Sequence, residues 1–420
     1  MIPELRSAFN TRFTDRGYAK LLAELERRCD GPIKFRVAET PIFVGKTLLE
    51  ELGEDGARLA RYLIADRHYL DKARCAIPTG YVVAEETAHP NFLTADFALV
   101  RTDAGVLEPR LVEIQAFPSV YAYQAELSKA YLAAFDLPQS LGIFLGGLDE
   151  SSYWELLRQT ILGGRDPENV ILAEVDPLNQ KTYPDFYVTS QRLGIPIVDI
   201  AQVEPLGNQL HYRDSSGRLT PIDRIYNRAI ADELIARNVH LRFDLESEWD
   251  VEWAGHPNWY FLISKFSIPW LSRSRQFSVV PPAVFVDEFL SGPGRQFLVD
   301  AGVMMPAEGE REGTYTELLL KPLFSFAGKG IEFEPTRARL EAISPGERSQ
   351  YLVQQRMRFE PTIETPFGLT QAEIRILYLW PEGGDLKPAL SLVRLGRGKM
   401  MGVDHNKNME WVGGSAAFYI

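Results

Sequence analysis

Apolar residues recur at helical spacing early in the chain and form continuous or alternating runs typical of strands further on. Residues 18–30 carry apolar side chains on one helical face, and 121–135 also have a helical pattern, so both segments predict helices. Residues 97–102 and 110–115 predict two strands joined by a turn-rich connection, and 81–86 a short strand.

The pattern of apolar and polar residues changes after Pro138. Residues 169–176 form a continuous apolar run, 182–193 have a helical pattern, and 195–200 form a second apolar run after Gly194. Strand, helix and strand over about 30 residues predict a βαβ unit with parallel strands, and therefore a small α/β domain. A hairpin-like segment at 209–222 follows it.

The C-terminal part contains several further strand-like runs. The sequence ELLLKPLFSFAGKGIEFEP (317–335) predicts a strand, a loop and a second strand. Residues 351–359, 373–380 and 391–396 predict three more strands.

Composition narrows the class of protein. The 420 residues, 45% of them hydrophobic, are those of a globular protein of two or three domains. The formal net charge of -12 argues against broad nucleic-acid binding, so a phosphate ligand needs a local group of cations. Cys29 and Cys75 lack the spacing of a zinc site or a disulfide framework. There is no apolar signal-peptide stretch and no membrane-length run, which indicates the cytoplasm and no membrane partner.

Lys321 ends a run of three leucines, and a loop rich in Gly, Ser and Lys follows it. Glycines let backbone N–H groups approach phosphate oxygens, and lysines supply positive charge. The loop residues that fit a polyphosphate are Ser325, Gly328, Lys329 and Gly330. The alternative is a hairpin with a solvated lysine at its tip.

Asp96, Glu113 and Gln115 lie on the two strands predicted around 96–115. Residues two apart on a strand point to the same face, and antiparallel pairing brings Asp96 beside the other two. Two carboxylates and an amide oxygen form a set suited to Mg²⁺, which is commonly held by few carboxylates together with nucleotide phosphates. The alternative is that both carboxylates are solvated strand residues.

The order of these pieces resembles the ATP-grasp family. In that family two lysines hold the ATP phosphates and a strand after the lid contacts adenine, which implies these roles for Lys321, Lys329 and the stretch Gln354, Gln355, Arg356 and Met357. Because the acidic set precedes the lysine loop, the order is similar to circularly permuted ATP-grasp ligases such as glutathionylspermidine synthetase. The segments IYNR (225–228), SK (264–265, with Lys265) and the terminal FYI also look like parts of that pattern.

The resemblance covers most of residues 80–420 and departs from the family at two positions. Gln115 stands where the family usually has Asn, and Thr94 stands where the glutathionylspermidine enzymes carry Arg. Arg375 and Arg394, on C-terminal strands, are candidates to replace that charge. Arg228 is either part of a buried ion pair or a clamp for a substrate carboxylate.

The implied architecture is α+β and α/β: a circularly permuted ATP-grasp fold with a Rossmann-like pre-ATP-grasp domain. We expect the ATP-grasp core sheet with the metal ligands at 1–140, the pre-ATP-grasp domain at 141–262, the lid at 263–355 and the rest of the core at 356–420.

The implied activity is an ATP-dependent ligase that joins a carboxylate to an amine through an acylphosphate and releases ADP and phosphate. ATP and Mg²⁺ are the implied cofactors, and a small molecule or peptide supplies the carboxylate and the amine. Two alternatives remain: a non-catalytic nucleotide-binding protein of the same fold, and a kinase that phosphorylates a small molecule.

Overall fold

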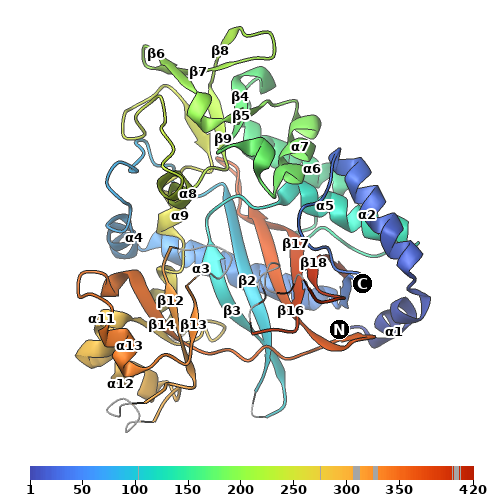
Figure 1. Ribbon diagram of the computed structural model, residues 1–420, viewed down its shortest axis with the longest axis vertical. Helices are drawn as coiled ribbons and strands as arrows, with labels where there is room; N and C mark the ends of the chain where they lie inside the picture. The colour runs from blue at the N-terminus through green and yellow to red at the C-terminus, as the bar shows by residue number, and fades with distance from the viewer. Residues whose placement is uncertain are drawn as a thin grey trace.

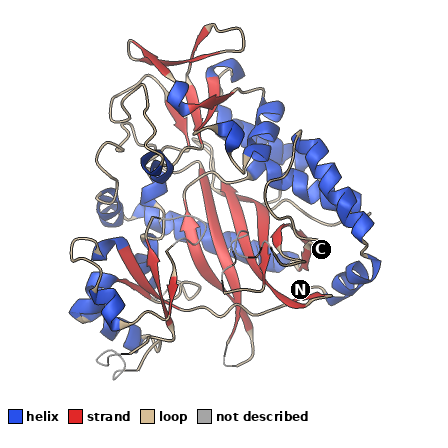
Figure 2. Ribbon diagram, viewed as in Figure 1, coloured by secondary structure: helices blue, strands red, loops and turns tan. Residues whose placement is uncertain are grey.

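The computed structural model describes residues 1–102, 104–274, 276–305, 313–324, 330–399, 401, 406 and 408–420. These residues form a mixed α/β fold with several sheets (Figures 1 and 2). The loop residues Ser325, Gly328 and Lys329 lie outside the described residues.

The central sheet joins an early hairpin to the C-terminal strands. Its order is β18-β17-β16-β2-β3, all pairs are antiparallel, and β15 pairs with the start of β16. The predicted antiparallel pair at 97–102 and 110–115 is confirmed as β2 and β3. The strands are β2 (Phe92–Arg101), β3 (Leu107–Gln115), β15 (Ile363–Thr365), β16 (Gly368–Leu379), β17 (Lys387–Gly396) and β18 (Gly413–Ser415).

One face of the central sheet is apolar and packs on helix α3 (Lys46–Ala65), which crosses behind the strands in Figure 1. Alternation along the strands turns Leu93 and Phe97 of β2 and Ile374 of β16 toward this helix. Gly56 of α3 allows the close approach, because a Cβ there would collide with the Tyr378 hydroxyl.

The opposite face of the central sheet is covered at one end by helices α5 (Tyr121–Ala134) and α6 (Glu150–Leu162). Leu377 and Leu379 of β16 share an apolar core with these helices. The helix predicted at 121–135 is therefore confirmed, and it is buried on nearly all sides.

The parallel sheet, in the order β10-β9-β4-β5, lies above the central sheet in Figure 1. Strand β4, helix α7 and strand β5 form the predicted βαβ unit, since β4 and β5 pair in parallel. Its elements are β4 (Val170–Glu174), α7 (Tyr183–Leu193), β5 (Ile197–Asp199), β9 (Arg224–Asn227), α8 (Ala231–Ala236) and β10 (Glu252–Ala254). The predicted hairpin lies in a three-stranded sheet of β6 (Glu204–Leu206), β7 (Gln209–Arg213) and β8 (Leu219–Pro221).

A third sheet, which we call the side sheet, has the antiparallel order β11-β14-β12-β13 and lies beside the central sheet (Figure 1). The strand, loop and strand predicted at 317–335 are confirmed in their two strands, β12 and β13. The elements are β11 (Ala283–Phe285), α11 (Val286–Ser291), α12 (Pro293–Asp300), β12 (Leu318–Pro322), β13 (Glu332–Phe333), α13 (Arg337–Glu341) and β14 (Tyr351–Gln355).

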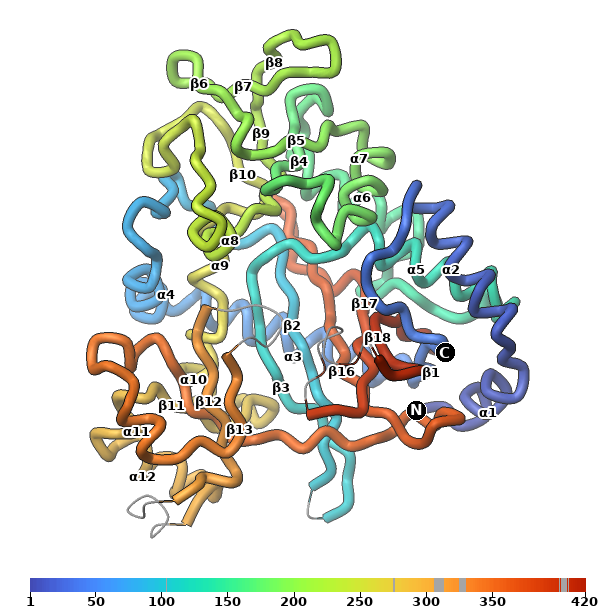
Figure 3. Tube along the Cα trace, in the orientation of Figure 1, coloured from blue at the N-terminus to red at the C-terminus, as the bar shows by residue number. Residues whose placement is uncertain are grey.

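The two ends of the chain lie close together, as Figure 3 shows. Strand β1 (Ile42–Val44) pairs in parallel with β19 (Ala417–Tyr419). Helices α1 (Pro3–Arg12) and α2 (Asp15–Cys29) flank this pair, and α2 confirms the helix predicted at 18–30. Helix α4 (Arg67–Arg74) lies between α3 and β2 in the chain, and the short helices α9 (Trp259–Leu262) and α10 (Ser267–Ser272) lead from the parallel sheet to the side sheet.

The strand predicted at 81–86 is wrong, because this segment forms neither a helix nor a strand. The side-chain amide of Asn258 accepts a hydrogen bond from the Val83 N–H and donates one to the Val83 carbonyl, both at 3.0 Å. A single side chain thus satisfies the backbone groups that a neighbouring strand would have paired.

Candidate functional site

Charged side chains gather on the face of the central sheet opposite α3. Strand register explains this, since Asp96 lies opposite both Glu113 on β3 and Arg375 on β16, and Glu373 lies opposite Arg394 on β17. Two lysines approach the same group. We call the whole set the charge cluster: Asp96, Glu113, Lys265, Lys321, Glu373, Arg375 and Arg394.

Asp96 is the centre of the cluster and is 1% exposed. The guanidinium of Arg375 binds it in bidentate fashion, with Nε 2.5 Å from Oδ1 and Nη2 2.6 Å from Oδ2. Arg394 donates from Nη1 to Oδ2 of Asp96 at 3.1 Å and also pairs with Glu373. Glu113 is less tightly held, with Oε1 3.7 Å from Arg375 Nη2.

Burial and neighbouring charges shift the pKa values of Asp96 and Glu373 in opposite directions. Burial alone would raise the pKa of Asp96, but Arg375 and Arg394 together lower it below its ordinary value. Burial raises the pKa of Glu373 to about 7, and Asp96 and Glu113 add to that rise against the opposing effect of Arg394. The cluster therefore holds one acid with a lowered pKa, Asp96, beside one with a pKa raised to about 7, Glu373.

Lys321 reaches the cluster from the side sheet. Its Nζ donates to the Val112 carbonyl of β3 at 3.4 Å, and Lys265 Nζ lies 3.6 Å from Glu113 Oε2. Burial lowers the pKa of Lys321 to about 8 despite the nearby Glu113. A lysine this buried is destabilising in the absence of an anion, so its position favours a ligand that brings negative charge.

Gln354 lies on the same face of the side sheet as Lys321. In the register of β12 and β14, Leu319 pairs with Gln354 and Lys321 with Leu352, and paired residues share a face. Gln354 is fully buried, yet neither its Oε1 nor its Nε2 has a hydrogen-bond partner among the described residues. An unpaired buried polar group costs about 1–3 kcal/mol, so this amide points to a ligand that supplies the missing bonds.

The other predicted site residues take several positions. Gln355 and Met357 are half-buried near the end of β14, and Gln115 is half-buried opposite Thr94. Gly330 lies just before β13 and has a φ of +80°. A Cβ there would lie 3.0 Å from Pro322 Cγ, so this position favours glycine.

Arg228 lies apart from the cluster and contacts the loop after β3. It donates from Nη1 to the Pro118 and Ser119 carbonyls and lies over the rings of Phe117 and Phe186, at 5.4 and 5.2 Å. Ser119 in turn accepts from Arg375 Nη1 at 3.3 Å. One loop therefore links the cluster to the end of β9.

Glu373 is a cluster residue that sequence reasoning missed. The signal was present in the alternation of β16, where Glu373 and Arg375 are two residues apart and share a face. Its position was not readable without the pairing of β16 with β17, which sets it opposite Arg394.

The predicted metal ligands Asp96, Glu113 and Gln115 differ in how far their oxygen atoms are already engaged. Among the described residues, no group of three or more His, Cys, Asp and Glu side chains is placed to hold a metal ion. Both oxygens of Asp96 already accept from guanidinium groups, whereas the Glu113 carboxylate has contacts of 3.6 Å or longer. Glu113 and Gln115 supply oxygen atoms of the kind that Mg²⁺ prefers, and a metal role for Asp96, Glu113 and Gln115 stays a prediction.

Comparison with known proteins gives a fold likeness. No family model and no curated protein matches the sequence. A solved glutathione synthetase-like effector from Globodera pallida is similar over 98% of this chain and 99% of that chain, at 12% identity and a TM-score of 0.54. A proposed gamma-glutamylcysteine synthetase from Methylobacillus flagellatus matches 86% of this chain and 85% of that one at 11% identity, but its TM-score of 0.38 adds nothing about the fold.

The first likeness shows that the chain shares the fold of that effector. The circular permutation, the domain boundaries and the family stay predictions. Separately, none of the helices in the described part of the chain is long and apolar enough to cross a membrane.

Proposed function

We propose that the protein is an ATP-dependent ligase that joins a carboxylate to an amine through an acylphosphate, with ADP and phosphate as the other products. The observation that carries the proposal is that a buried cation and a buried amide without hydrogen bonds lie on one face of the side sheet. Lys321 lacks a full counter-charge, and Gln354 lacks any hydrogen-bond partner among the described residues. ATP supplies both an anionic phosphate chain and a base edge with donors and acceptors.

The chain's own cations would neutralise the phosphates. Lys321 would hold the phosphate chain from the side sheet, while Arg375 and Arg394 would meet the transferring phosphoryl group from the central sheet. Phosphoryl transfer depends mainly on such positioning and charge neutralisation. Glu113 and Gln115 would hold Mg²⁺, which would supply positive charge to offset that of the phosphates.

The reaction balances in two steps. A substrate carboxylate oxygen attacks the γ-phosphorus of ATP, the bond to the bridging oxygen breaks, and ADP leaves. An amine nitrogen then attacks the carbonyl carbon of the acylphosphate, phosphate leaves, and the nitrogen loses a proton. Water must be excluded because it hydrolyses the acylphosphate.

A second candidate is a nucleotide-binding protein without catalysis. Its support is that both oxygens of Asp96 are held by arginines and that Gln115 replaces the usual asparagine. This arrangement favours anion binding over metal binding at Asp96.

Isothermal titration with a nonhydrolysable ATP analogue, with and without Mg²⁺, tests the proposal. We expect binding that Mg²⁺ strengthens and that Glu113→Gln weakens, with the exposed Glu364→Gln as a matched control. Binding that is indifferent to both changes would refute the ligase and favour the second candidate.

ADP release screened against pooled amino acids, polyamines and small peptides then identifies the reaction. An amide product supports the ligase. ADP with a stable phosphorylated product selects a kinase, and a flat response across all pools selects the non-catalytic protein.

A further inference from the structure

The charge cluster and Gln354 are enclosed where the side sheet meets the central sheet. Lys321 is 4% exposed, Asp96 is 1% exposed and Gln354 is fully buried. The Lys321 Nζ on β12 donates to the Val112 carbonyl of β3 at 3.4 Å, which joins the two sheets directly. A ligand reaches groups this buried only after the two sheets separate, as when a lid opens. The contacts that hold the side sheet in place therefore decide when a ligand enters.

One of these contacts is aromatic and lies just after β12. Phe324, three residues after Lys321, packs against two neighbouring rings of helix α9. Its ring centroid lies 5.1 Å from that of Phe261 and 6.5 Å from that of Tyr260. Figure 1 shows α9 between the parallel sheet and the side sheet. Phe324 thus connects the end of β12 to a part of the molecule outside the side sheet.

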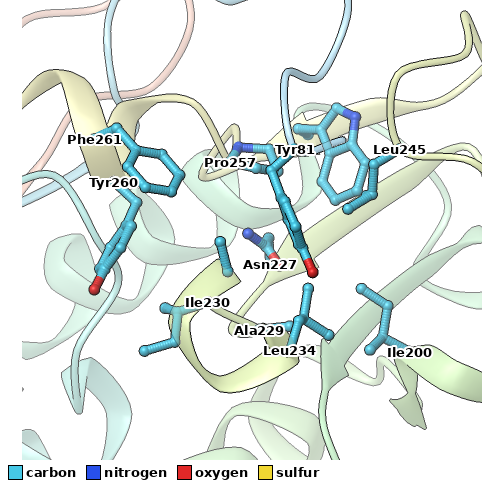
Figure 4. Close-up of a pocket in the computed structure, with 12 residues that line it drawn as sticks. Tyr81, Ile200, Asn227, Ala229, Ile230, Leu234, Leu245, Pro257, Tyr260 and Phe261 are labelled. Atoms are coloured by element: carbon cyan, nitrogen blue, oxygen red, sulfur yellow. The ribbon is translucent and has the colours of Figure 1, made fainter. Parts of the chain in front are cut away.

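The two rings of α9 are held firmly. The Tyr260 hydroxyl donates to Asp232 of α8 at 2.8 Å, and the Tyr260 ring centroid lies 6.0 Å from that of Phe117 in the loop after β3. Figure 4 shows the side chains of Tyr260 and Phe261 leaving α9 in different directions along one side of a small pocket. The cavity in this pocket is about 20 Å³, room for about one water, so the two rings have little space to move.

Phe324 is held less firmly than the rings of α9. Its side chain is half-buried, and the Leu323 N–H donates to the Gln350 carbonyl at 2.9 Å, which ties the chain down just before Phe324. Beyond its buried area, an aromatic pair shifts an equilibrium by about twofold to tenfold, whereas the folding constants of small domains are about 10³–10⁸. The contact can therefore open many times without unfolding of the protein.

We propose that Phe324 is an aromatic latch. Its contact with Tyr260 and Phe261 holds the side sheet against the central sheet, and release of that contact lets a ligand reach the charge cluster. Because Asp232 fixes the Tyr260 hydroxyl, the latch also links the side sheet to α8 beside the parallel sheet. That the ligand is a nucleotide rests on the proposed function, whereas the latch itself does not.

Hydrogen–deuterium exchange of the full-length protein without nucleotide tests the latch. Phe324→Leu removes the ring, so exchange at the backbone amides of β12 should become about twofold to tenfold faster, while exchange in β2 stays unchanged. Phe324→Tyr keeps the ring and should exchange as the wild type does. The exposed Phe367→Leu is the matched control and should change nothing. Unchanged exchange in Phe324→Leu, or equally fast exchange in Phe324→Tyr, would overturn the proposal.

A variant of the other half of the latch gives an independent check. Tyr260→Leu removes the ring on α9 and should speed exchange in β12 by a similar factor. Thermal unfolding shows whether each variant is folded. Wild-type exchange in folded Tyr260→Leu would mean that Phe324 does not act through α9, which also contradicts the latch.

Stopped-flow binding of a fluorescent ATP analogue tests the entry of the ligand. Since only the open form admits the analogue, Phe324→Leu should raise its association rate constant by about twofold to tenfold. Faster exchange with an unchanged association rate would show that the analogue enters elsewhere and would overturn the role of the latch in entry. An analogue that does not bind the wild type refutes the proposed function instead, and hydrogen exchange alone then decides the latch.

Discussion

Replacing Lys321 by methionine should make the free protein more stable while removing its hold on phosphate. Lys321 is 4% exposed, and burial lowers its pKa from 10.5 to about 8. At about 1.4 kcal/mol per pKa unit, the charged form is disfavoured by about 3 kcal/mol relative to a lysine in water. Methionine has a similar length and no charge, so Lys321→Met should raise the free energy of unfolding near pH 7 by about that amount.

The difference in stability between Lys321→Met and the wild type should depend on pH. Between pH 8 and 10.5 the unfolded chain keeps the proton of Lys321 and the folded chain loses it, so the wild-type protein gains stability as the pH rises. The advantage of Lys321→Met is therefore full below pH 8 and disappears above pH 10.5.

Urea unfolding of both proteins at a series of pH values measures this difference, with the exposed Lys34→Met as the control. Titration with the ATP analogue measures the lost binding. A stability difference that is constant from pH 7 to 10, or a variant less stable than the wild type at pH 7, would refute the reasoning from burial.

Three further predictions concern the same region. Gln354→Leu removes two unpaired buried polar atoms and should stabilise the free protein by about 1–3 kcal/mol in urea unfolding while weakening binding of the ATP analogue by calorimetry. Arg375→Ala leaves Asp96 with a single guanidinium and should destabilise by about 3 kcal/mol in the same assay; full retention of stability would contradict the buried pair. Between pH 4.5 and 7 the folded wild type keeps the proton of Glu373 while the unfolded chain loses it, so the wild type loses stability as the pH rises. Glu373→Gln should therefore gain about 3 kcal/mol in free energy of unfolding relative to wild type over this range. A stability difference that does not change with pH would argue against the raised pKa.

Local pattern was sufficient for much of the fold. The parallel βαβ unit at 169–200 was predictable because continuous apolar runs on either side of a helical pattern have few other solutions. The hairpin of β2 and β3 was predictable because two strand-like runs are joined by a turn-rich connection. The segment at 81–86 was not, since its backbone is satisfied by Asn258, which is remote in sequence.

The sequence by itself determined which residue types are present for anion chemistry and which strands carry them: Lys321 at the end of a leucine run, and Asp96 and Glu113 on a predicted hairpin. The tertiary structure alone decided their partners. Asp96 meets Arg375 and Arg394 across nearly 300 residues of chain, and Glu373 joins them through the register of β16 and β17. The physical reason is that periodicity fixes the face on which a side chain lies, whereas contacts between strands far apart in sequence depend on packing that no local pattern records.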